Sequence, residues 1–515
     1  MAAHANASRI SLNHMTYEVV VVGGGIGGLT VAALLAARGM NVCLLERQSR
    51  AGGCVATYEK LGYEFEPTAS LYASWQPGEI HDKVFAELPV SPPEVHTVSP
   101  AYVVRLPDET NIAITENDDE FTEHLRAAFP ECAKAAINFY KESHIIGNAL
   151  LRTVQRVPDL LTASRSRRAR LIAFEARVAG RILASMNHTA AEHLTQTSFR
   201  FHRFIDAQLQ IFAQRASDEC AYIYAAVALT LPRRGMYAIR GGAQTLADIL
   251  IESIKKSGGT VRLGATALRV VCDANGRATG IDLLSGERIT ATRAVISNLT
   301  VQDTYAKLVG ANRTPADIHT RLKKLRGWSA FLLFLSLDET AAQRLSSERV
   351  LALTEWQEEQ ENYNPAGAQF MFAAAPAWNA RAPEGFRAAT VSTFTDAAPW
   401  FAFQESEAEY EAQDEREIKN WWQKIHQAMP ELGDGAELID TMTPLDYYEA
   451  TRRRLGMVGG TGQSMDVFGS RAFSHRTTIP NLFIVGDSVF PGMGVAAVTQ
   501  SALIVADTLT TQASR

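Results

Sequence analysis

Cysteine is scarce in this chain of 515 residues. The five cysteines are odd in number and scattered, and no two of them form a Cys-x-x-Cys pair. Because a disulfide framework and a zinc site both need characteristic spacings, this pattern argues against either one. His81, His202 and His475 also stand without metal-ligand spacing. We therefore expect a protein of a reducing compartment that holds no metal.

Long apolar runs are absent as well. The longest uncharged candidate, Ala221 to Pro232, has about half of the ~20 residues that a bilayer-spanning helix requires. The polar stretch before Tyr17 carries one arginine and lacks the apolar core of a secretory signal, so we expect a disordered leader. These absences favour a cytoplasmic protein, and they leave peripheral contact with the cytoplasmic face of a membrane open.

No excess of positive charge is present to attract nucleic acid. The formal net charge is -6, with 46% hydrophobic and 21% charged residues, which is typical of an ordinary globular protein. Neither a Gly-x-Ser-x-Gly elbow nor a His-Glu-x-x-His motif occurs, so a hydrolase is not indicated. The length exceeds the size at which one core stops growing, so we expect a cofactor domain and at least one substrate domain.

Strand and helix patterns point to a nucleotide-binding domain built from separated pieces. The β-branched run Tyr17 to Val22 predicts a buried strand, Ile26 to Arg38 a helix, and Asn41 to Glu46 a second strand. A meander is predicted from Thr260 to Asn298, and a strand, turn and helix from Asn481 to Leu509. The first three elements form a βαβ unit, and we expect the later segments to complete the same domain.

Gly23, Gly25 and Gly28 form a Gly-x-Gly-x-x-Gly motif between the first strand and the helix. The first glycine permits a tight turn, the second lets the backbone approach a pyrophosphate, and the third lets the helix pack closely on the strand. Glu46 ends the second strand, where a carboxylate can accept hydrogen bonds from ribose hydroxyls and repel a 2′-phosphate. The motif, its strands and its terminal acid together predict a dinucleotide site.

NAD and FAD share this fingerprint, so the choice between them rests on other residues. The pair Gly52-Gly53 allows the chain to pass beside the pyrophosphate. Asp487, which follows Gly486, can bind a polyol such as ribityl. A second helix start near Gly494-Val495 can stabilise negative charge on a reduced flavin. These features favour FAD.

The chain resembles the phytoene desaturase, carotenoid isomerase and retinol saturase family of flavoproteins, within the wider amine-oxidase-like superfamily. The resemblance covers nearly the whole length. It rests on five segments: Val20 to Leu29, Glu46-Arg47 with Gly52-Gly53, Arg234 to Tyr237 with Gly241-Gly242, Ala294 to Asn298, and Gly486 to Val495. The last segment is the most specific of the five.

This resemblance implies a fold and a set of cofactor contacts. We expect an α/β fold with a discontinuous, Rossmann-like two-dinucleotide-binding FAD domain (residues 16–100, 236–309 and 460–515), a helical substrate or membrane-facing region (101–235) and a mixed-sheet substrate domain (310–459). The implied FAD contacts are Gly23, Gly25, Ile26, Gly27 and Gly28 in the phosphate loop, Glu46 and Arg47 at the adenosine ribose, Gly52 and Gly53 beside the pyrophosphate, the Ala267 backbone at adenine, Gly486 and Asp487 at the ribityl–pyrophosphate part, and Gly494 and Val495 at the pyrimidine end of the isoalloxazine.

Two positions depart from the family pattern. Many relatives carry arginine after the glycine pair, whereas this chain has Cys54, which removes a phosphate contact. Where relatives often have an acidic residue, a spacer and glycine, this chain reads Phe65 to Ser70 without a glycine. We interpret Cys54 as a packing thiol.

The resemblance implies oxidoreduction of carbon–carbon bonds in a large apolar isoprenoid, such as a carotenoid-like polyene, by hydride exchange with flavin N5. Electrons would pass to oxygen, a quinone or a separate reductase, because only one complete dinucleotide motif is present. Apolar runs such as Phe331 to Leu335 and Phe370 to Phe372 fit such a substrate, and no obvious charge cluster marks the substrate side. No catalytic residue can be named. The alternatives are redox-neutral cis–trans isomerisation with reduced FAD, amine oxidation, and a non-catalytic prenyl-lipid escort.

A basic amphipathic segment from Leu150 to Met186 raises the question of membrane contact. Its apolar residues recur at helical spacing, and its arginines fall along one flank of that stripe: Leu171, Phe174, Val178 and Ile182, with Arg170, Arg177 and Arg181. Either the stripe inserts into a membrane surface beside its arginines, or the helix packs on its own domain with a solvated basic flank.

Overall fold

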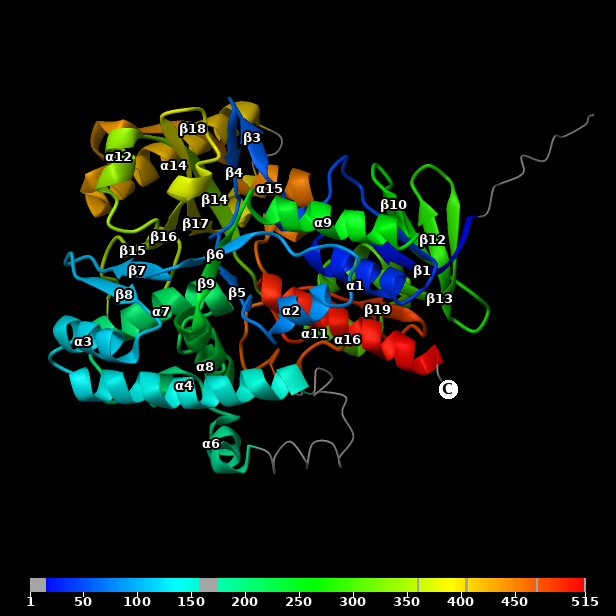
Figure 1. Ribbon diagram of the computed structural model, residues 1–515, viewed down its shortest axis with the longest axis horizontal. Coiled ribbons are helices and arrows are strands. Elements are labelled where there is room, and N and C mark those ends of the chain that lie inside the picture. The colour runs from blue at the N-terminus through cyan, green and yellow to red at the C-terminus, as the bar shows by residue number, and fades with distance from the viewer. Residues whose placement is uncertain (1–14, 157–174, 359–360, 403–405, 469–470, 514–515) are drawn as a thin grey trace, which may run out of the picture.

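The computed structural model describes residues 15–156, 175–358, 361–402, 406–468 and 471–513. Two seven-stranded sheets organise these residues, and they lie in opposite halves of the molecule (Figure 1). Each sheet takes strands from distant parts of the sequence, so the chain passes repeatedly between the two halves.

The first sheet has the strand order β10-β2-β1-β13-β12-β11, and β19 also pairs with β13. The pairs around β1 and β2, and the pair β13–β19, are parallel, whereas β11, β12 and β13 form an antiparallel meander. The strands are β1 (Met15–Val22), β2 (Val42–Leu45), β10 (Thr260–Arg262), β11 (Ala267–Cys272), β12 (Ala278–Leu283), β13 (Arg288–Ser297) and β19 (Leu482–Ile484). One expectation needs correction: β10 is not part of the meander, because it pairs in parallel with β2 at the sheet edge.

Helices cover both faces of this sheet, which explains why Val19 to Val22 are all buried. One face shares an apolar cluster with α1, α9 and α16, and the other packs against η4 and α11. These elements are α1 (Ile26–Ala37), α9 (Ala243–Lys256), α16 (Val495–Ala513), η4 (Thr304–Val309) and α11 (Ala316–Lys324). The layers place the starts of α1 and α16 close to the ends of β1 and β19.

The second sheet has the order β18-β14-β17-β16-β15-β7-β8. Its strands are β7 (Tyr102–Arg105), β8 (Asn111–Ile114), β14 (Ser329–Asp338), β15 (Arg349–Leu353), β16 (Gln369–Ala374), β17 (Phe386–Thr395) and β18 (Ala436–Met442). The strands β7 and β8 fall within the segment 101–235, for which we expected helices, and β7 pairs with β15. The domain boundaries taken from the sequence stay a prediction.

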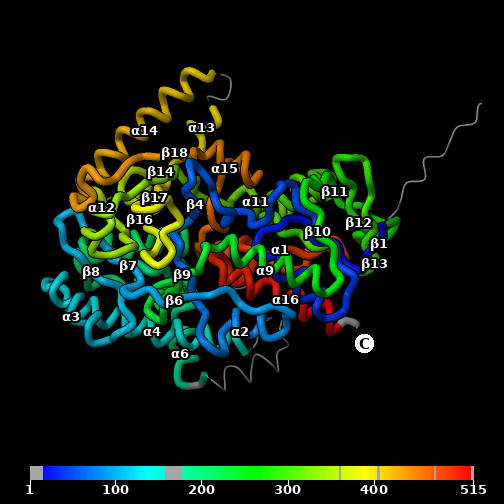
Figure 2. The backbone as a smooth tube through the Cα atoms, turned by 45° about the horizontal axis from the view of Figure 1, so that its top comes forward, coloured from blue at the N-terminus to red at the C-terminus, as the bar shows by residue number. Residues whose placement is uncertain are grey.

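The outer face of this sheet lies under α12 (Glu339–Arg344), α13 (Ala398–Ala402) and α14 (Glu407–Ala428), and Figure 2 shows α13 and α14 on that outer side. Phe331 and Phe370 face these helices and contact Trp400 and Trp421 respectively. Only alternate residues of the two apolar runs, such as Phe334, turn toward the other face. The runs therefore contribute to two cores, and most of their aromatic rings lie away from the expected substrate side.

Helices fill the space below the second sheet in Figure 1. They are α3 (Asp118–Ala128), α4 (Ala133–Arg156), α6 (Ala176–Ser185), α7 (Phe199–Ala213) and α8 (Tyr222–Thr230). Within the described residues no helix is long and apolar enough to cross a membrane. The amphipathic stretch is described only at its ends, by α4 and α6, and Arg170, Leu171 and Phe174 lie outside the described residues.

Short strands and helices join the two halves. They are β3 (Tyr58–Lys60), β4 (Tyr63–Phe65), β5 (Tyr72–Ala73), α2 (Ile80–Phe85), β6 (Val95–Val98), β9 (Met236–Ile239) and α15 (Pro444–Thr451). β9 pairs with both β5 and β6 and leads into α9. The segment Arg234 to Gly242 therefore connects the helices beside the second sheet to α9, a helix that covers the first sheet.

Candidate functional site

The turn between β1 and α1 has the geometry expected of a phosphate loop. Gly23 has φ +100°, and a Cβ on Gly28 would lie 2.1 Å from the carbonyl oxygen of Gly23. Gly25 caps α1 without a side-chain hydrogen bond, and Ile26 and Gly27 follow as buried first-turn residues. A helix start whose N–H groups lack a side-chain cap is suited to an anion such as a diphosphate.

Glu46 is held at the end of β2 by backbone donors. Its Oε2 accepts a hydrogen bond from Gly24 N at 2.6 Å, and its Oε1 accepts one from Gln48 N at 2.8 Å. The carboxylate therefore lies against the phosphate loop, with lone pairs left for ribose hydroxyls. Arg47 extends elsewhere, because its Nη2 donates to the carbonyl groups of Glu449 and Ala450.

The glycine pair Gly52-Gly53 packs directly against the backbone of the phosphate loop. Gly52 N donates to Gly24 O at 2.8 Å, and a Cβ on Gly53 would lie 3.1 Å from Gly25 Cα. Both glycines have positive φ, +129° and +60°. A side chain at either position would be strained, so the pair keeps the two loops in close backbone contact.

The motif Gly486 to Val495, which follows β19, also lies against the phosphate loop. Gly486 N donates to Ser501 Oγ at 3.1 Å, and a Cβ on Gly27 would lie 3.4 Å from Gly486 Cα. Asn298 lies between the motifs, with its Nδ2 donating to Val485 O at 3.2 Å. The two glycine motifs, far apart in sequence, therefore meet around one asparagine, and Asp487 follows immediately.

Ala267 and Val495 lie at the two ends of this arrangement. Ala267 starts β11, just beyond a segment in which Ala265 N donates to Glu46 O at 2.8 Å. Gly494, with φ +92°, precedes Val495, the first residue of α16. The predicted adenine contact thus lies beyond Glu46, and the predicted isoalloxazine contact lies at a helix start beyond Asp487.

Together these positions form a cradle, which we define as Gly23 to Gly28, Glu46, Gly52-Gly53 and Gly486-Asp487. An uncapped helix start, a fixed carboxylate and close glycine backbones match the diphosphate, the ribose and the narrow passage that FAD requires. The individual FAD contacts stay predictions, but the residues present fit this cofactor.

Arg453 lies in the cradle and was not found from the sequence. Its Nη2 donates to both carboxylate oxygens of Asp487, at 2.8 and 2.6 Å. It follows α15, one of the elements that join the two halves of the molecule, and no local motif marks it. The nearest signal was indirect: Cys54, which Arg453 contacts, departs from the family pattern.

A buried charge cluster lies where the sequence gave no indication of one. Glu66 accepts hydrogen bonds from the Tyr72 hydroxyl, from Ala243 N at 2.9 Å and from Arg381 Nη2 at 3.0 Å. Burial alone would raise the pKa of Glu66, but the charge of Arg381 and the hydrogen bonds hold that pKa below its usual value. Arg349 lies nearby, 1% exposed. The cluster joins Glu66, before β5, to the start of α9 and to Arg381, and the expectation that no charge cluster marks the substrate side stays a prediction.

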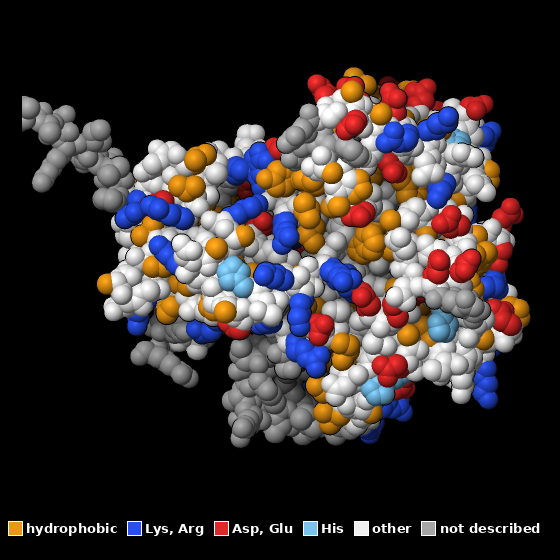
Figure 3. All heavy atoms as spheres, turned by 180° about the vertical axis from the view of Figure 1, so that it is seen from behind, with side chains coloured by type: hydrophobic (Ala, Val, Ile, Leu, Met, Phe, Trp, Pro, Cys, Tyr) orange, Lys and Arg blue, Asp and Glu red, His pale blue; other side chains and the backbone are white. Residues whose placement is uncertain are grey.

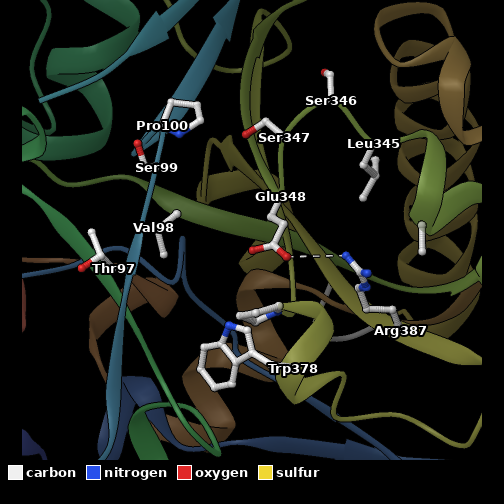
Figure 4. Close-up of a pocket in the computed structure, with 12 residues that line it drawn as sticks. Thr97, Val98, Ser99, Pro100, Leu345, Ser346, Ser347, Glu348, Trp378 and Arg387 are labelled. Carbon is white, nitrogen blue, oxygen red and sulfur yellow. Dashed lines mark ion pairs between the residues drawn. The ribbon is translucent and has the colours of Figure 1, made fainter. Parts of the chain in front are cut away.

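Two further features lie outside the cradle. A surface pocket of about 380 Å³ lies beside β6 and the start of β15, where Glu348 and Arg387 form an ion pair of 3.6 Å near Trp378 (Figure 4). None of the predicted site residues lines it. Among the described residues no group of three or more His, Cys, Asp or Glu side chains could hold a metal ion.

Comparison with known proteins gives sequence relatives that cover nearly the whole chain. Residues 26–510 match the family described as flavin containing amine oxidoreductase. Prolycopene isomerase, chloroplastic, of Arabidopsis thaliana is 24% identical over 513 residues, which is 95% of this chain and 82% of that protein. All-trans-retinol 13,14-reductase of Danio rerio is 24% identical over 546 residues, covering 95% and 86%.

Solved structures share the fold at lower identity. An oxidoreductase from Methanosarcina mazei aligns with a TM-score of 0.64 and 17% identity over 96% of this chain and all 100% of that chain. Putrescine oxidase bound to putrescine aligns with a TM-score of 0.59 and 13% identity, over 98% and 100%. These similarities confirm the α/β fold, and the family match confirms FAD as the cofactor. The protein is an FAD-dependent oxidoreductase related to phytoene desaturases, and its chain belongs to the flavin-containing amine oxidoreductase family.

Proposed function

We propose that this enzyme oxidises or reduces carbon–carbon bonds of a large apolar isoprenoid, a carotenoid-like polyene. The named relatives include prolycopene isomerases and retinol 13,14-reductases, whose names denote polyene substrates. FAD, when bound, supplies hydride exchange at its N5 atom. Desaturation and saturation of such a polyene are the two outcomes that the test below separates.

One observation carries this proposal: an apolar cluster extends from the helical region to the cofactor loop. Leu351 and Met371 of the second sheet belong to it, together with Phe204 of α7 and Tyr224 of α8. A Cβ on Gly492, close to the predicted flavin end of the cradle, would lie 3.0 Å from the Tyr224 hydroxyl oxygen. An extended hydrocarbon reaching the flavin from this side would meet mainly apolar side chains.

The residues around this cluster suit exclusion of water better than proton transfer. Burial raises the pKa of Tyr224, so its phenol stays protonated at neutral pH. His475 contacts Ser501 Oγ at 3.2 Å behind Gly486, and burial lowers its pKa to about 4. Neither group is set to act as a base near the flavin, which agrees with a reaction that depends on alignment of an apolar substrate.

The surface offers a further feature consistent with an apolar ligand. In the rear view, apolar side chains gather near the centre of the molecule, among lysine and arginine side chains (Figure 3). Exposed apolar groups that gather in this way often mark ligand or membrane contacts. Peripheral contact with a membrane would give such an enzyme access to a lipid-soluble polyene, and it belongs to this proposal.

Redox-neutral cis–trans isomerisation with reduced FAD is the second candidate, because several relatives are named prolycopene isomerases. Amine oxidation finds support only in the shared fold of putrescine oxidase. A prenyl-lipid escort would not need the intact cradle with Glu46 and Asp487.

The test mixes oxidised and reduced enzyme separately with carotenoid precursors, retinoids and simple amines. We expect a polyene to be converted with matching oxidation or reduction of the flavin, followed by absorbance and product chromatography. Isomerisation by the reduced form alone, without net flavin turnover, would select the second candidate. Rapid flavin reduction by an amine, with every polyene unchanged, would overturn the proposal. NADH or NADPH alone should reduce the flavin slowly, because electrons pass to oxygen, a quinone or a separate reductase.

A further inference from the structure

The Arg453 guanidinium contacts Cys54, the position at which the family pattern has an arginine. Arg453 Nη1 donates to Cys54 Sγ at 3.1 Å, although the two residues are 399 positions apart in the sequence. The Arg453 side chain is only 11% exposed. It follows α15 in the sequence and contacts Cys54 and Asp487, which belong to two different segments of the site.

The hydrogen bonds of Arg453 leave spare donor capacity. Its Nη2 is taken up by Asp487, but Nη1 meets a thiol sulfur, which is a weak acceptor. Its Nε is buried and has no hydrogen-bond partner in the part of the chain that the structure describes. A buried cation with a weak contact and an unused donor is suited to an anionic oxygen.

The charges of the cradle require such a cation. A dinucleotide diphosphate brings two negative charges next to Asp487, whose carboxylate would repel it unless neutralised. The start of α1 contributes only about half a positive charge. Two other arginines close to the phosphate loop in sequence are directed elsewhere: Arg47 donates to carbonyl groups near α15, and Arg50 pairs with Glu59.

We propose that Arg453 is a cofactor-binding residue that contacts the FAD diphosphate from the side on which Cys54 lies. It thereby supplies the charge that an arginine at position 54 would bring, and it fixes the Asp487 carboxylate. This inference rests on the proposed placement of FAD against Gly53 and Asp487. It is independent of which substrate the enzyme converts.

The first measurement is the Kd of apoprotein for FAD, followed by quenching of flavin fluorescence. Arg453→Met should raise this Kd about 10- to 100-fold, the effect of losing one or two hydrogen bonds to a charged group. Adding Cys54→Arg to Arg453→Met should recover about tenfold or more, because a guanidinium returns to the same point. Arg453→Lys keeps the charge without the planar fork, so we expect an intermediate Kd and shifted ³¹P resonances of bound FAD.

The matched control is Arg452→Met, an arginine of the same segment that pairs with Glu449 outside the cradle, and its Kd should stay within about twofold of wild type. A Kd for Arg453→Met within about twofold of wild type would overturn the proposal. The proposal would also be overturned if Arg453→Met raises the Kd, the added Cys54→Arg does not restore it, and the ³¹P resonances of bound FAD are unchanged in Arg453→Lys. Arg453 would then act only through Asp487. If circular dichroism shows that Arg453→Met does not fold, Arg453→Lys decides by the same criteria. If Glu46→Ala does not weaken FAD binding, the proposed placement of FAD in the cradle is wrong, which is a different outcome from failure of the Arg453 proposal. Absence of polyene turnover would affect neither result.

Discussion

The carboxylate of Glu66 and the guanidinium of Arg381 form an ion pair of 3.0 Å in which both side chains are almost fully buried. The same carboxylate accepts the N–H of Ala243 at the start of α9. Glu66 therefore connects three parts of the chain: the segment before β5, the start of α9, and the connection between β16 and β17 that carries Arg381. It stands in the region Phe65 to Ser70, which departs from the family pattern.

We predict that Glu66→Gln destabilises the protein by about 3 kcal/mol, because it leaves the buried charge of Arg381 uncompensated. Urea denaturation followed by circular dichroism measures the difference. Glu64→Gln is the matched control, since Glu64 is exposed on β4, two residues before Glu66. Equal stabilities for the two variants would show that the buried pair contributes no more than a surface charge.

Glu46→Ala should weaken FAD binding by about 2–4 kcal/mol, the effect of losing one or two charge-assisted hydrogen bonds. The carboxylate also holds Gly24 N and Gln48 N, so the phosphate loop loses support as well. Titration of apoprotein with FAD measures the loss, and exposed Glu59→Ala provides the control. Unchanged flavin occupancy on dilution would show that Glu46 does not contact the ribose.

FAD should be bound without a covalent link. No cysteine or histidine lies between Gly486 and Val495, and the contact of Cys54 is with Arg453. Acid precipitation should therefore release all of the yellow colour into solution. Colour that stays in the pellet would contradict this prediction.

The sequence predicted those parts of the site whose chemistry is local. The turn at Gly23 to Gly28 and the acid at the end of β2 follow from strand and helix patterns, because one short segment contains every group involved. Arg453 could not be found in this way, since its contact with Cys54 joins residues that are 399 positions apart in the sequence. The pairing of β10 with β2 was missed for a similar reason: a short strand takes its partner from tertiary packing.

Stability should fall as the pH is lowered below about 6.5 because of His81. The ring is 1% exposed and stacks on Trp75 with centroids 4.1 Å apart. Burial lowers the pKa of His81 to about 3. Between these pH values the unfolded chain binds a proton that the folded protein does not, so stability rises with pH and is lost on acidification, by about 1.4 kcal/mol per pH unit.

Replacement of this histidine tests that slope. His81→Phe keeps an aromatic ring against Trp75 and should flatten the loss of stability between pH 6.5 and 5 by about 1.4 kcal/mol per unit. Urea denaturation at several pH values gives the comparison, and the exposed His188→Phe should keep the slope of the wild type. A variant at position 81 that loses stability as steeply as wild type would show that the folded protein protonates His81 normally.

The last prediction concerns the surface around α6, which lies beyond α4 in Figure 1. Val178 and Ile182 pack against the protein's own helical cluster, as the alternative without membrane contact requires. Leu183 and Met186, however, are 58% and 47% exposed.

We expect the protein to float with anionic vesicles more than with neutral ones. Leu183→Ser with Met186→Ser should reduce this binding, because both side chains are free to enter the lipid surface. Replacing Arg177 and Arg181 with glutamine should reduce it by about 1 kcal/mol for each charge, although Arg181 already pairs with Glu142 at 2.8 Å.

The control is Leu284→Ser, which removes a leucine that is 68% exposed on the turn between β12 and β13, in the other half of the molecule. It should leave vesicle binding unchanged if contact is confined to α6. If vesicle binding depends on neither the lipid charge nor the α6 substitutions, this helix only packs against its own protein. Loss of binding in the Leu284 variant as well would mean that exposed apolar groups act without regard to position, and a membrane-facing side would then have no support.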